Sequence, residues 1–395
     1  MSLPARALIH SARLVSGGTL TPEAWVTFEN GAVAAVGTGS SWRALGIDEV
    51  QTTDAAGRLL TPGFIDIHCH GAGGAAFDDG TEAIRTALAV HHRHGTTRAV
   101  LSLVTAGQAD LEGRLAVVSA EAERNPLVLG AHLEGPFLDA TFRGAHDPAL
   151  LRSPDPEGVE RLLAVGRGQI RQVTLAPELP GAADALARFV AAGVSVAVGH
   201  SAADYDTARA AFDAGATILT HAFNGMKGIH HRAPGPVAAA MDSPGVTLEV
   251  INDGVHVHPS VVRLAFAGSP GRIALVTDAM AATGASDGCY VLGSLAVQVT
   301  DGVARLVDGG AIAGSTLTLD AALRNAVAAG VALPDAVTAL TETPARAIGR
   351  GHDLGRLSVG YAADAVLLGP DLTVDAVFAA GRPLPRSPST ALPEA

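Results

Sequence analysis

The feature that most constrains this chain is an alternation, from Gly63 onward, of short apolar segments with alanine-rich segments of helical length. Strands that alternate with helices predict a parallel sheet with right-handed crossovers. Continuous apolar strands indicate burial on both faces, and eight such units predict closure into a (β/α)8 barrel. The eight expected strands are residues 64–68, 99–104, 127–133, 172–176, 195–199, 217–220, 247–251 and 273–277. Helices are expected at 82–94, 111–123, 183–192, 205–214 and 260–267.

Short strands are expected at both ends of the chain. Residues 25–28 and 32–36 flank Asn30-Gly31, a strong hairpin signal, and 364–368 and 376–379 read as strands again. The two ends are therefore expected to form one small β-sandwich domain. The expected boundaries are 1–58 and 355–385 for this domain, 59–354 for the barrel and 386–395 for a tail. After the eighth strand, 289–307 reads as a hairpin insertion that turns at Asp301-Gly302, and helices are expected at 317–329 and 334–348.

Composition excludes several classes of protein. With 48% hydrophobic and 17% charged residues among 395, the chain is expected to be compact and folded. The net charge is −12 and no basic run occurs, so a nucleic-acid partner is not expected. No apolar stretch approaches the ~20 residues of a membrane span, and only two cysteines occur, so we expect a cytoplasmic protein away from membranes.

Polar residues recur where the expected strands end, which in a barrel of this kind is where catalytic groups lie. They are His68 and His70 on the first strand, His132 and Glu134 on the third, His200 on the fifth, His221 on the sixth and Asp278 on the eighth. A lone histidine at a strand end is more often structural than a ligand. Several strands that bring imidazoles and carboxylates to one mouth instead predict a metal site, since such buried polar groups are costly without a partner. Asp278 could be a ligand, a base or a helix N-cap.

Other histidines are interpreted as structural. His91, His92 and His94 are expected on the surface of a helix C-terminus, where protonated imidazole suits the helix dipole. His132 is expected to pack or to support the site rather than to bind an ion.

An ordered set of motifs resembles the N-acetylglucosamine-6-phosphate deacetylase family of the amidohydrolase superfamily across nearly the whole chain. The matching segments are PGFIDIHCHG at 62–71, HLEGPF at 132–137, RGAHDP at 143–148, VGHSAA at 198–203, THAFNGMKGIHHRAPG at 220–235, NDGVHVHP at 252–259, LVTDAMAATG at 275–284 and AGSTLTLD at 313–320. The resemblance implies hydrolysis of an N-acetyl amide to an amine and acetate, in a homodimer that acts on an amino sugar phosphate.

The resemblance also implies roles for individual residues. Glu134, His200 and His221 would hold a divalent metal, and Asp278 would be the general acid/base. Phosphate and sugar contacts are implied for Asn224 and Gly225 through their backbone, for Arg232 and His256, and for His146 near the acetyl or hydroxyl groups. Arg232 or His256 could reach the site of a neighbouring subunit.

The number and identity of the ions stay open. Some members of the family lack the two histidines of the first strand and bind one ion. Here His68 and His70 are both present, so a second ion that shares Glu134 and Asp278 is an alternative to a supporting role for these histidines. The set of ligands suits Zn, Fe, Co or Mn.

A lysine bridge between two ions is excluded. Related binuclear enzymes often use a carboxylated lysine at the end of the fourth strand, but this strand ends in Ala176-Pro177-Glu178 and the single lysine is Lys227. Glu134 is then the only candidate bridge. Two rival functions remain: an amidohydrolase for another N-acyl sugar or amide, and an inactive barrel that serves as a binding protein. The intact set of ligands weighs against the second.

Overall fold

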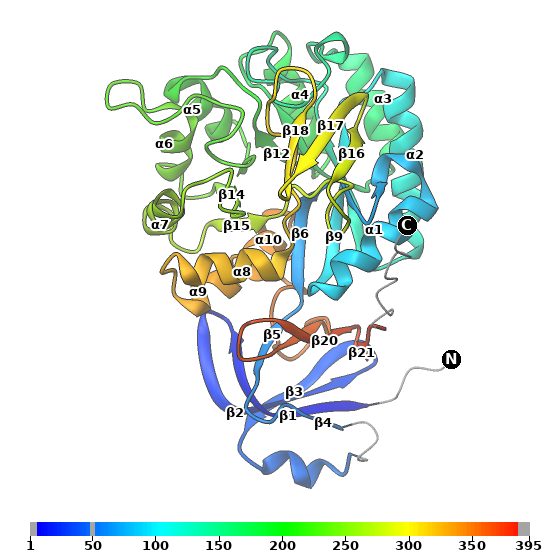
Figure 1. Ribbon diagram of the computed structural model, residues 1–395, viewed down its shortest axis with the longest axis vertical. Coiled ribbons are helices and arrows are strands. Elements are labelled where there is room, and N and C mark those ends of the chain that lie inside the picture. The colour runs from blue at the N-terminus through cyan, green and yellow to red at the C-terminus, as the bar shows by residue number, and fades with distance from the viewer. Residues whose placement is uncertain (1–5, 48–51, 386–395) are drawn as a thin grey trace.

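The computed structural model of the chain describes residues 6–47 and 52–385, and shows a barrel above a smaller β domain (Figure 1). The barrel strands, each hydrogen-bonded to the next in this order, are β6 (Phe64–Cys69), β9 (Thr96–Val104), β10 (Val128–Glu134), β11 (Ile170–Leu175), β12 (Ser195–Val198), β13 (Ile218–Leu219), β14 (Thr247–Ile251) and β15 (Ile273–Val276). The ring closes where the backbone N–H of Asp278, just after β15, donates to the carbonyl of His68 in β6 (2.8 Å). The predicted (β/α)8 barrel and its eight strands are confirmed.

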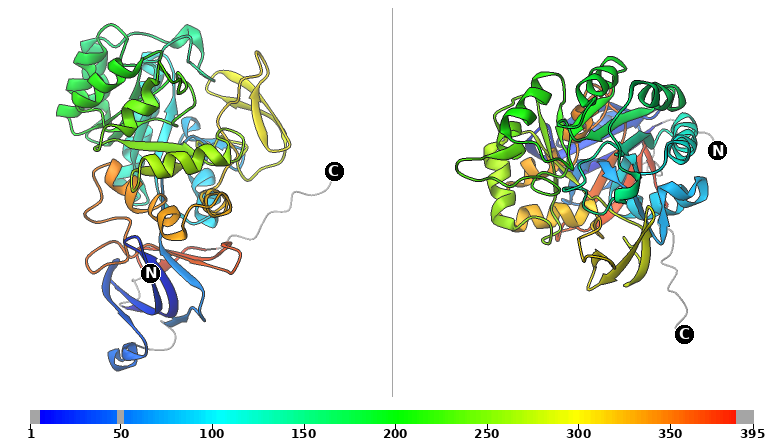
Figure 2. Two further views of the ribbon diagram at one scale, coloured as in Figure 1. Left: turned by 90° about the vertical axis from the view of Figure 1, so that its left-hand side faces the viewer. Right: turned by 90° about the horizontal axis from the view of Figure 1, so that it is seen from above.

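The strands form where predicted because their side chains are buried on both faces, as in β10, where every residue is buried. Helices surround the barrel (Figure 2). They are α1 (Thr81–Arg93), α2 (Gln108–Arg124), α3 (Pro156–Gly166), α4 (Ala182–Ala191), α5 (Tyr205–Asp213), α6 (Gly235–Met241), α7 (Pro259–Gly268) and α8 (Leu319–Ala328). The sequence did not predict α3 and α6. The start signal of α3 is nevertheless plain, since Asp155 accepts a hydrogen bond from the backbone N–H of Gly158 and Pro156 follows it.

Two details of the prediction were wrong. One helix was expected over 334–348, but α9 (Leu333–Thr338) and α10 (Glu342–Ala347) are separate. Pro344 has no N–H to donate to the carbonyl of Leu340, which instead accepts a hydrogen bond from Ile65 (2.9 Å). His91 is buried rather than exposed, and one of its ring nitrogens, Nε2, lies 3.2 Å from the carbonyl oxygen of Gly71. Burial lowers the pKa of His91 to about 4.

The insertion after β15 is a three-stranded antiparallel sheet beside the mouth of the barrel (Figure 2). Its strands are β16 (Gly288–Leu292), β17 (Leu295–Thr300) and β18 (Val303–Leu306). The turn at Asp301-Gly302 is confirmed, and both residues have positive φ, as such turns require. Val297 and Val299 of β17 pack with Val104 and Met280 of the barrel in a small core.

The strands near both chain ends form one curled, hydrogen-bonded sheet below the barrel, so the small terminal β domain is confirmed (Figure 1). Its order is β21 (Arg382–Pro383), β20 (Val374–Ala379), β19 (Ala365–Leu368), β5 (Leu59–Pro62), β1 (Ala7–Ser16), β2 (Thr19–Glu29) and β3 (Ala32–Thr38), with β4 (Thr52–Asp54) also paired to β1. Asn30 and Gly31 make the predicted turn between β2 and β3. The domain encloses a core of its own around Ile9, Phe28 and Leu367.

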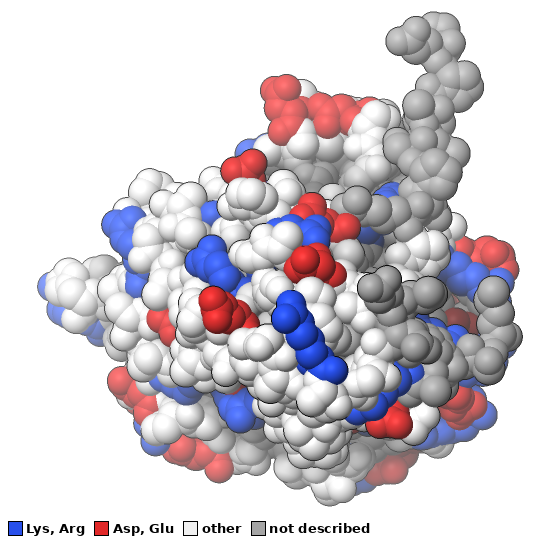
Figure 3. Space-filling view, turned by 90° about the horizontal axis from the view of Figure 1, so that it is seen from below, with Lys and Arg blue, Asp and Glu red and all other residues white. Residues whose placement is uncertain are grey.

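Short elements complete the fold. They are the strands β7 (Gly71–Ala72) and β8 (Ala75–Ala76) and the 3-10 helices η1 (Ser41–Leu45), η3 (Phe77–Asp79) and η4 (Pro148–Leu150). Seen from below, lysines and arginines are interspersed with aspartates and glutamates (Figure 3). None of the described helices is long and apolar enough to cross a membrane. The exact domain boundaries and the cytoplasmic location stay predictions, and the expected tail at 386–395 lies outside the described residues.

Candidate metal centre and active site

A cavity of about 250 Å³ opens at the carboxyl-terminal ends of the barrel strands. Most of the residues predicted from the sequence line it: His70, Glu134, His146, His200, His221, Asn224, Gly225, His256 and Asp278. Leu292 of β16 and Ile312, which follows β18, add an apolar wall from the insertion. The cavity therefore has polar side chains at the strand ends and an apolar wall contributed by the insertion.

Glu134, His200 and His221 form one compact group of possible metal ligands. The Nδ1–H of His200 donates to the carbonyl of Phe142 (2.9 Å), and the Nδ1–H of His221 donates to that of Asn224 (3.1 Å). These bonds fix both tautomers, so each Nε2 carries a lone pair. The two Nε2 atoms lie 2.9 Å apart and each is 3.2 Å from Oε1 of Glu134.

Three electron-rich atoms that face one another in a buried site repel unless a cation lies among them. The donor set, two imidazoles and a carboxylate, is the one that zinc and similar divalent ions prefer. The residues thus fit the divalent metal that the sequence predicts.

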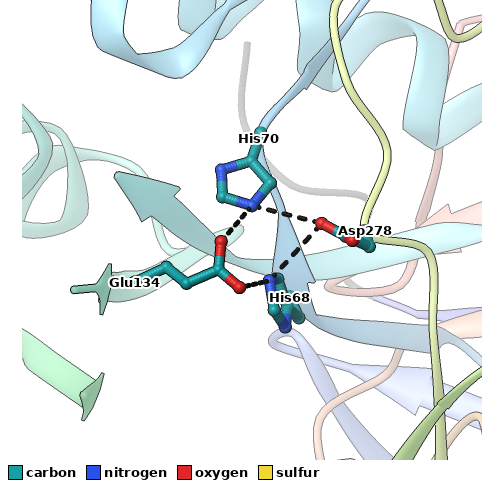
Figure 4. A group of neighbouring side chains, drawn as sticks. All are labelled: His68, His70, Glu134 and Asp278. Carbon is teal, nitrogen blue, oxygen red and sulfur yellow. Dashed lines mark ion pairs between the residues drawn. The ribbon is translucent and has the colours of Figure 1, made fainter. Parts of the chain in front are cut away.

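His68, His70, Glu134 and Asp278 form a second such group, in which the four side chains converge on one point (Figure 4). Nε2 of His70 lies 3.0 Å from Oε2 of Glu134 and 3.2 Å from Oδ1 of Asp278. Nε2 of His68 lies 3.2 Å from Oε1 of Glu134 but makes no hydrogen bond, although it is buried. Glu134 belongs to both groups, which is the position required of a bridging carboxylate.

The backbone is strained at three of these residues. His200, His221 and Asp278 have φ values of 47°, 25° and 51°, a region that residues with a Cβ seldom adopt. Each lies two residues beyond the end of a strand, so the turn of the backbone aims the side chain into the cavity. Such strain is typical of functional sites, where the surrounding fold holds it in place.

The carboxylates of the site are ionised at neutral pH. Burial alone would raise the pKa of Asp278, but His68 and His70 more than offset this and the pKa is lowered. The pKa of Glu134 is likewise held well below its usual value by His68, His146, His200 and His221 despite burial. Asp278 is thus able to accept a proton.

His146 and His256 also line this cavity. Nδ1 of His146 lies 2.9 Å from Oγ1 of Thr105, and burial lowers the pKa of His146 to about 4, so the ring is neutral. The Nδ1–H of His256 donates to Oδ2 of Asp253 (2.7 Å). Burial opposes protonation of His256, but Asp253 outweighs it and raises the pKa, which favours an imidazolium that can bind an anion.

Two predicted site residues do not line this cavity: His68, which is fully buried beside Glu134 and Asp278, and Arg232. Arg232 lies exposed in the loop before α6, with Nη1 2.7 Å from Nε2 of His231. Lys227, in the same loop, is also exposed. Within the described chain, the cavity thus lacks an arginine for an anionic group.

A layer of buried polar residues lies beneath the candidate ligands, and of its members Glu249 was not noticed in the sequence. Glu249, in β14, accepts hydrogen bonds from the Nδ1–H of His68 (3.0 Å) and the Nε2–H of Gln172 (2.7 Å). Its one signal in the sequence is a charged residue in the middle of an apolar strand. His132 lies in the same layer between Ser102 and Thr174, 2.8 Å from each hydroxyl, as expected of a supporting residue.

Comparisons with known proteins agree with this geometry. The family model described as "Amidohydrolase family" matches residues 59–384. The chain belongs to the amidohydrolase family. This membership implies a divalent metal, and the two groups of ligands described above are the candidate sites.

Two curated relatives and one solved structure cover most of this amidohydrolase. The N-acetylgalactosamine-6-phosphate deacetylase of Escherichia coli O157:H7 is 39% identical over 84% of the chain and 89% of its own length. The N-acetylglucosamine-6-phosphate deacetylase of Vibrio furnissii is 36% identical over 94% and 93%. A mutant N-acetyl-D-glucosamine-6-phosphate deacetylase from Mycobacterium smegmatis, solved in complex with N-acetyl-D-glucosamine-6-phosphate, is 42% identical, with a TM-score of 0.90 and coverage of 96% and 99%.

Proposed function

We propose that the chain hydrolyses the N-acetyl amide of N-acetylglucosamine 6-phosphate to glucosamine 6-phosphate and acetate. The observation that carries the proposal is the convergence of four imidazoles with Glu134 and Asp278 at the carboxyl-terminal ends of the barrel strands, in a chain whose relatives are named for this reaction. Amide hydrolysis needs an activated water, an acid/base and stabilisation of the oxyanion, and the cavity has groups for each.

Glu134, His200 and His221 would hold one divalent ion, and His68, His70, Glu134 and Asp278 would hold the second of a pair. Zn, Fe, Co or Mn each suit these ligands. Such an ion, when bound, lowers the pKa of a coordinated water and polarises a carbonyl.

The chain's own groups would carry the protons. Oδ of Asp278 accepts the proton of the attacking water and later returns it to the departing amine nitrogen, and the ionised carboxylate is the form that can accept this proton. The neutral ring of His146, 3.5 Å from Glu134, is placed to contact the acetyl or hydroxyl groups of the substrate. His256 would bind the phosphate, with Asn224 and Gly225 contributing backbone groups.

Arg232 fits this proposal through a second subunit. We infer a homodimer in which Arg232, exposed on its loop and absent from the chain's own cavity, reaches the phosphate in the partner's site. Arg232→Ala is expected to raise KM for the phosphorylated sugar while kcat changes little. Sedimentation equilibrium tests the dimer, and a monomer with full activity would contradict this role of Arg232.

The phosphate requirement can be measured directly. Acetate release is compared for N-acetylglucosamine 6-phosphate and for unphosphorylated N-acetylglucosamine. Because a charge-assisted hydrogen bond contributes about 1.5–3 kcal/mol, we expect kcat/KM to differ at least tenfold. Equal values for the two sugars would refute the phosphate contacts.

A second candidate substrate is N-acetylgalactosamine 6-phosphate, because the relative from Escherichia coli O157:H7 that carries this name is 39% identical. The two sugars differ only in the orientation of one hydroxyl group. The same acetate assay with both 6-phosphates decides between them, and a higher kcat/KM for the galacto sugar would replace our first proposal with the second.

A further inference from the structure

Glu249 stands out because it is a carboxylate in the middle of a barrel strand, where side chains fill the interior and apolar residues prevail. Its exposed fraction is 0%, and it does not line the cavity. Burying an ionised carboxylate is costly unless hydrogen bonds and a compensating positive charge surround it. Glu249 must therefore be held for a reason that packing alone does not supply.

The contacts of Glu249 join three barrel strands. Oε1 accepts from Gln172 in β11 (2.7 Å), and Oε2 accepts from the ring of His68 in β6 (3.0 Å). Oε2 also accepts from the backbone N–H of His221, just after β13 (3.3 Å). One carboxylate oxygen is thus bonded to a member of each group of ligands.

We propose that Glu249 is a positioning residue, which fixes the tautomer of His68 and so enables the group His68, His70, Glu134 and Asp278 to hold an ion. A carboxylate accepts a hydrogen bond only from a protonated Nδ1, so the neutral ring of His68, the form that binds an ion, has its lone pair on Nε2. That atom is the buried Nε2 that makes no hydrogen bond and faces Glu134 and Asp278. A carboxylate behind a ligating histidine also increases the basicity of the ring.

Gln172 supports the arrangement from the other side. Its amide N–H groups can only donate, so it holds Oε1 of Glu249 and leaves Oε2 turned toward His68. The positive charge that compensates the buried carboxylate would then be the ion on the far side of the imidazole. The inference rests on the metal-dependent function proposed above, and it predicts two ions per chain.

The test is equilibrium dialysis of the metal-stripped full-length protein against Zn²⁺. Wild type is expected to bind two ions per chain. Glu249→Leu is expected to bind one of them with about 10–100-fold lower affinity, the usual cost of losing the partner of a ligating histidine. Glu249→Gln, which keeps an acceptor for Nδ1–H, is expected to retain more of that affinity than Glu249→Leu.

Thr174→Val is the matched control. It removes the hydroxyl 2.8 Å from Nε2 of His132, another buried barrel histidine, which belongs to neither group of ligands. Both ions should bind this variant as they bind wild type. An equal loss in Thr174→Val and Glu249→Leu would show a general effect on the barrel interior and would overturn the proposal.

A second readout needs no metal. Ring ¹⁵N chemical shifts of the metal-free protein, with the signals of His68 assigned through His68→Asn, should report Nδ1–H in wild type and in Glu249→Gln. In Glu249→Leu, the shifts should show that the proton of His68 is no longer held preferentially on Nδ1. Unchanged shifts, unchanged Zn²⁺ affinity in Glu249→Leu, or one ion per wild-type chain would each overturn the role of Glu249. Failure of the fully loaded enzyme to release acetate would instead refute the proposed reaction.

Discussion

Two carboxylates organise the cavity at the scale of single residues. Glu134 contacts His68, His70, His200 and His221 at 3.0 to 3.2 Å, and Asp278 contacts His68 and His70 from the opposite side. Both carboxylates have lowered pKa values, but they differ in place. Both line the cavity, but Glu134 belongs to both groups of ligands, whereas Asp278 belongs to only one of them. This difference favours a structural bridge for Glu134 and proton transfer for Asp278.

Asp278→Asn tests the assignment of the acid/base. The amide keeps the shape of the side chain but cannot accept the proton of the attacking water. We expect kcat to fall about 10²–10⁴-fold, the usual contribution of general acid–base catalysis, while at least one ion stays bound at Glu134, His200 and His221. Acetate release and metal analysis measure the two effects, and unchanged hydrolysis by this variant would refute the role of Asp278.

The sequence predicted that the candidate ligands converge because each stands near the end of an apolar strand, and the barrel brings these strand ends together. It did not identify Glu249, since a contact between β14 and β6 across the interior leaves no periodic signal. The position of Arg232 was equally hidden, because a loop has no repeating pattern that fixes where its side chains point.

At the scale of elements, a contact between His94 and Asp320 joins the end of α1 to the start of α8. His94 caps the C-terminus of α1, and its Nδ1 lies 3.1 Å from Oδ1 of Asp320 in the first turn of α8. Thr318 and Arg324 also donate to Asp320. Burial would raise the pKa of Asp320, but these three partners lower it from 3.8 to about 2.

The stability that Asp320 contributes should therefore disappear in acid. Its folded pKa lies below its unfolded value, so the contribution is complete above pH ~5 and is lost as the pH falls through 4 toward 2. A shift of nearly two units corresponds to about 2 kcal/mol at pH 7. Asp320→Asn should lower the free energy of unfolding by about this amount at pH 7, and the difference should shrink toward pH 3.

Asp184→Asn serves as the control for this prediction. Asp184 lies in the first turn of α4 but is exposed, and it pairs with Arg188 on the surface. Denaturant unfolding of both variants at pH 7 and pH 3 gives the comparison. If Asp320→Asn lowered the free energy of unfolding by the same amount at pH 7 and at pH 3, the ion-pair interpretation would be contradicted.

The ends of helices were harder to predict than the positions of strands. Residues 334–348 have a continuous helical pattern, yet the carbonyl of Leu340 is taken by Ile65 and Pro344 cannot donate, so two helices form. His91 was misjudged for a similar reason. Its place near a helix end suggested solvent, but the helix packs that face against the β7 segment, where Gly71 lies within reach of the ring.

At the scale of the whole molecule, a buried ion pair joins the barrel to the terminal domain. Arg98 of β9 and Asp364, which precedes β19, are both largely buried, and the guanidinium donates to both carboxylate oxygens at 2.6 and 3.1 Å. Asp364 also accepts a hydrogen bond from the backbone N–H of Ala380. The guanidinium of Arg98 also donates to the carbonyl of Pro126. The pair spans 266 positions of the chain, a distance over which sequence patterns carry no information.

Arg98→Met should destabilise the fold strongly, because it leaves the carboxylate of Asp364 buried without its partner. Loss of one member of a buried pair costs about 3–5 kcal/mol, whereas an exposed pair contributes little. Arg85→Met is the control, since Arg85 pairs with Glu82 on the surface. Thermal unfolding should show a much lower midpoint for Arg98→Met alone, and similar midpoints for the two variants would refute the role of the pair.

At this scale we propose that the cavity is the active site of a metal-dependent amidase for an N-acetylated amino sugar 6-phosphate. The most direct measurement is acetate release from N-acetylglucosamine 6-phosphate by protein stripped with a chelator and then reloaded with Zn²⁺, Co²⁺ or Mn²⁺. We predict that stripping abolishes acetate release and that at least one of these ions restores it. Equal release before and after stripping, or none from any reloaded protein, would contradict the claim.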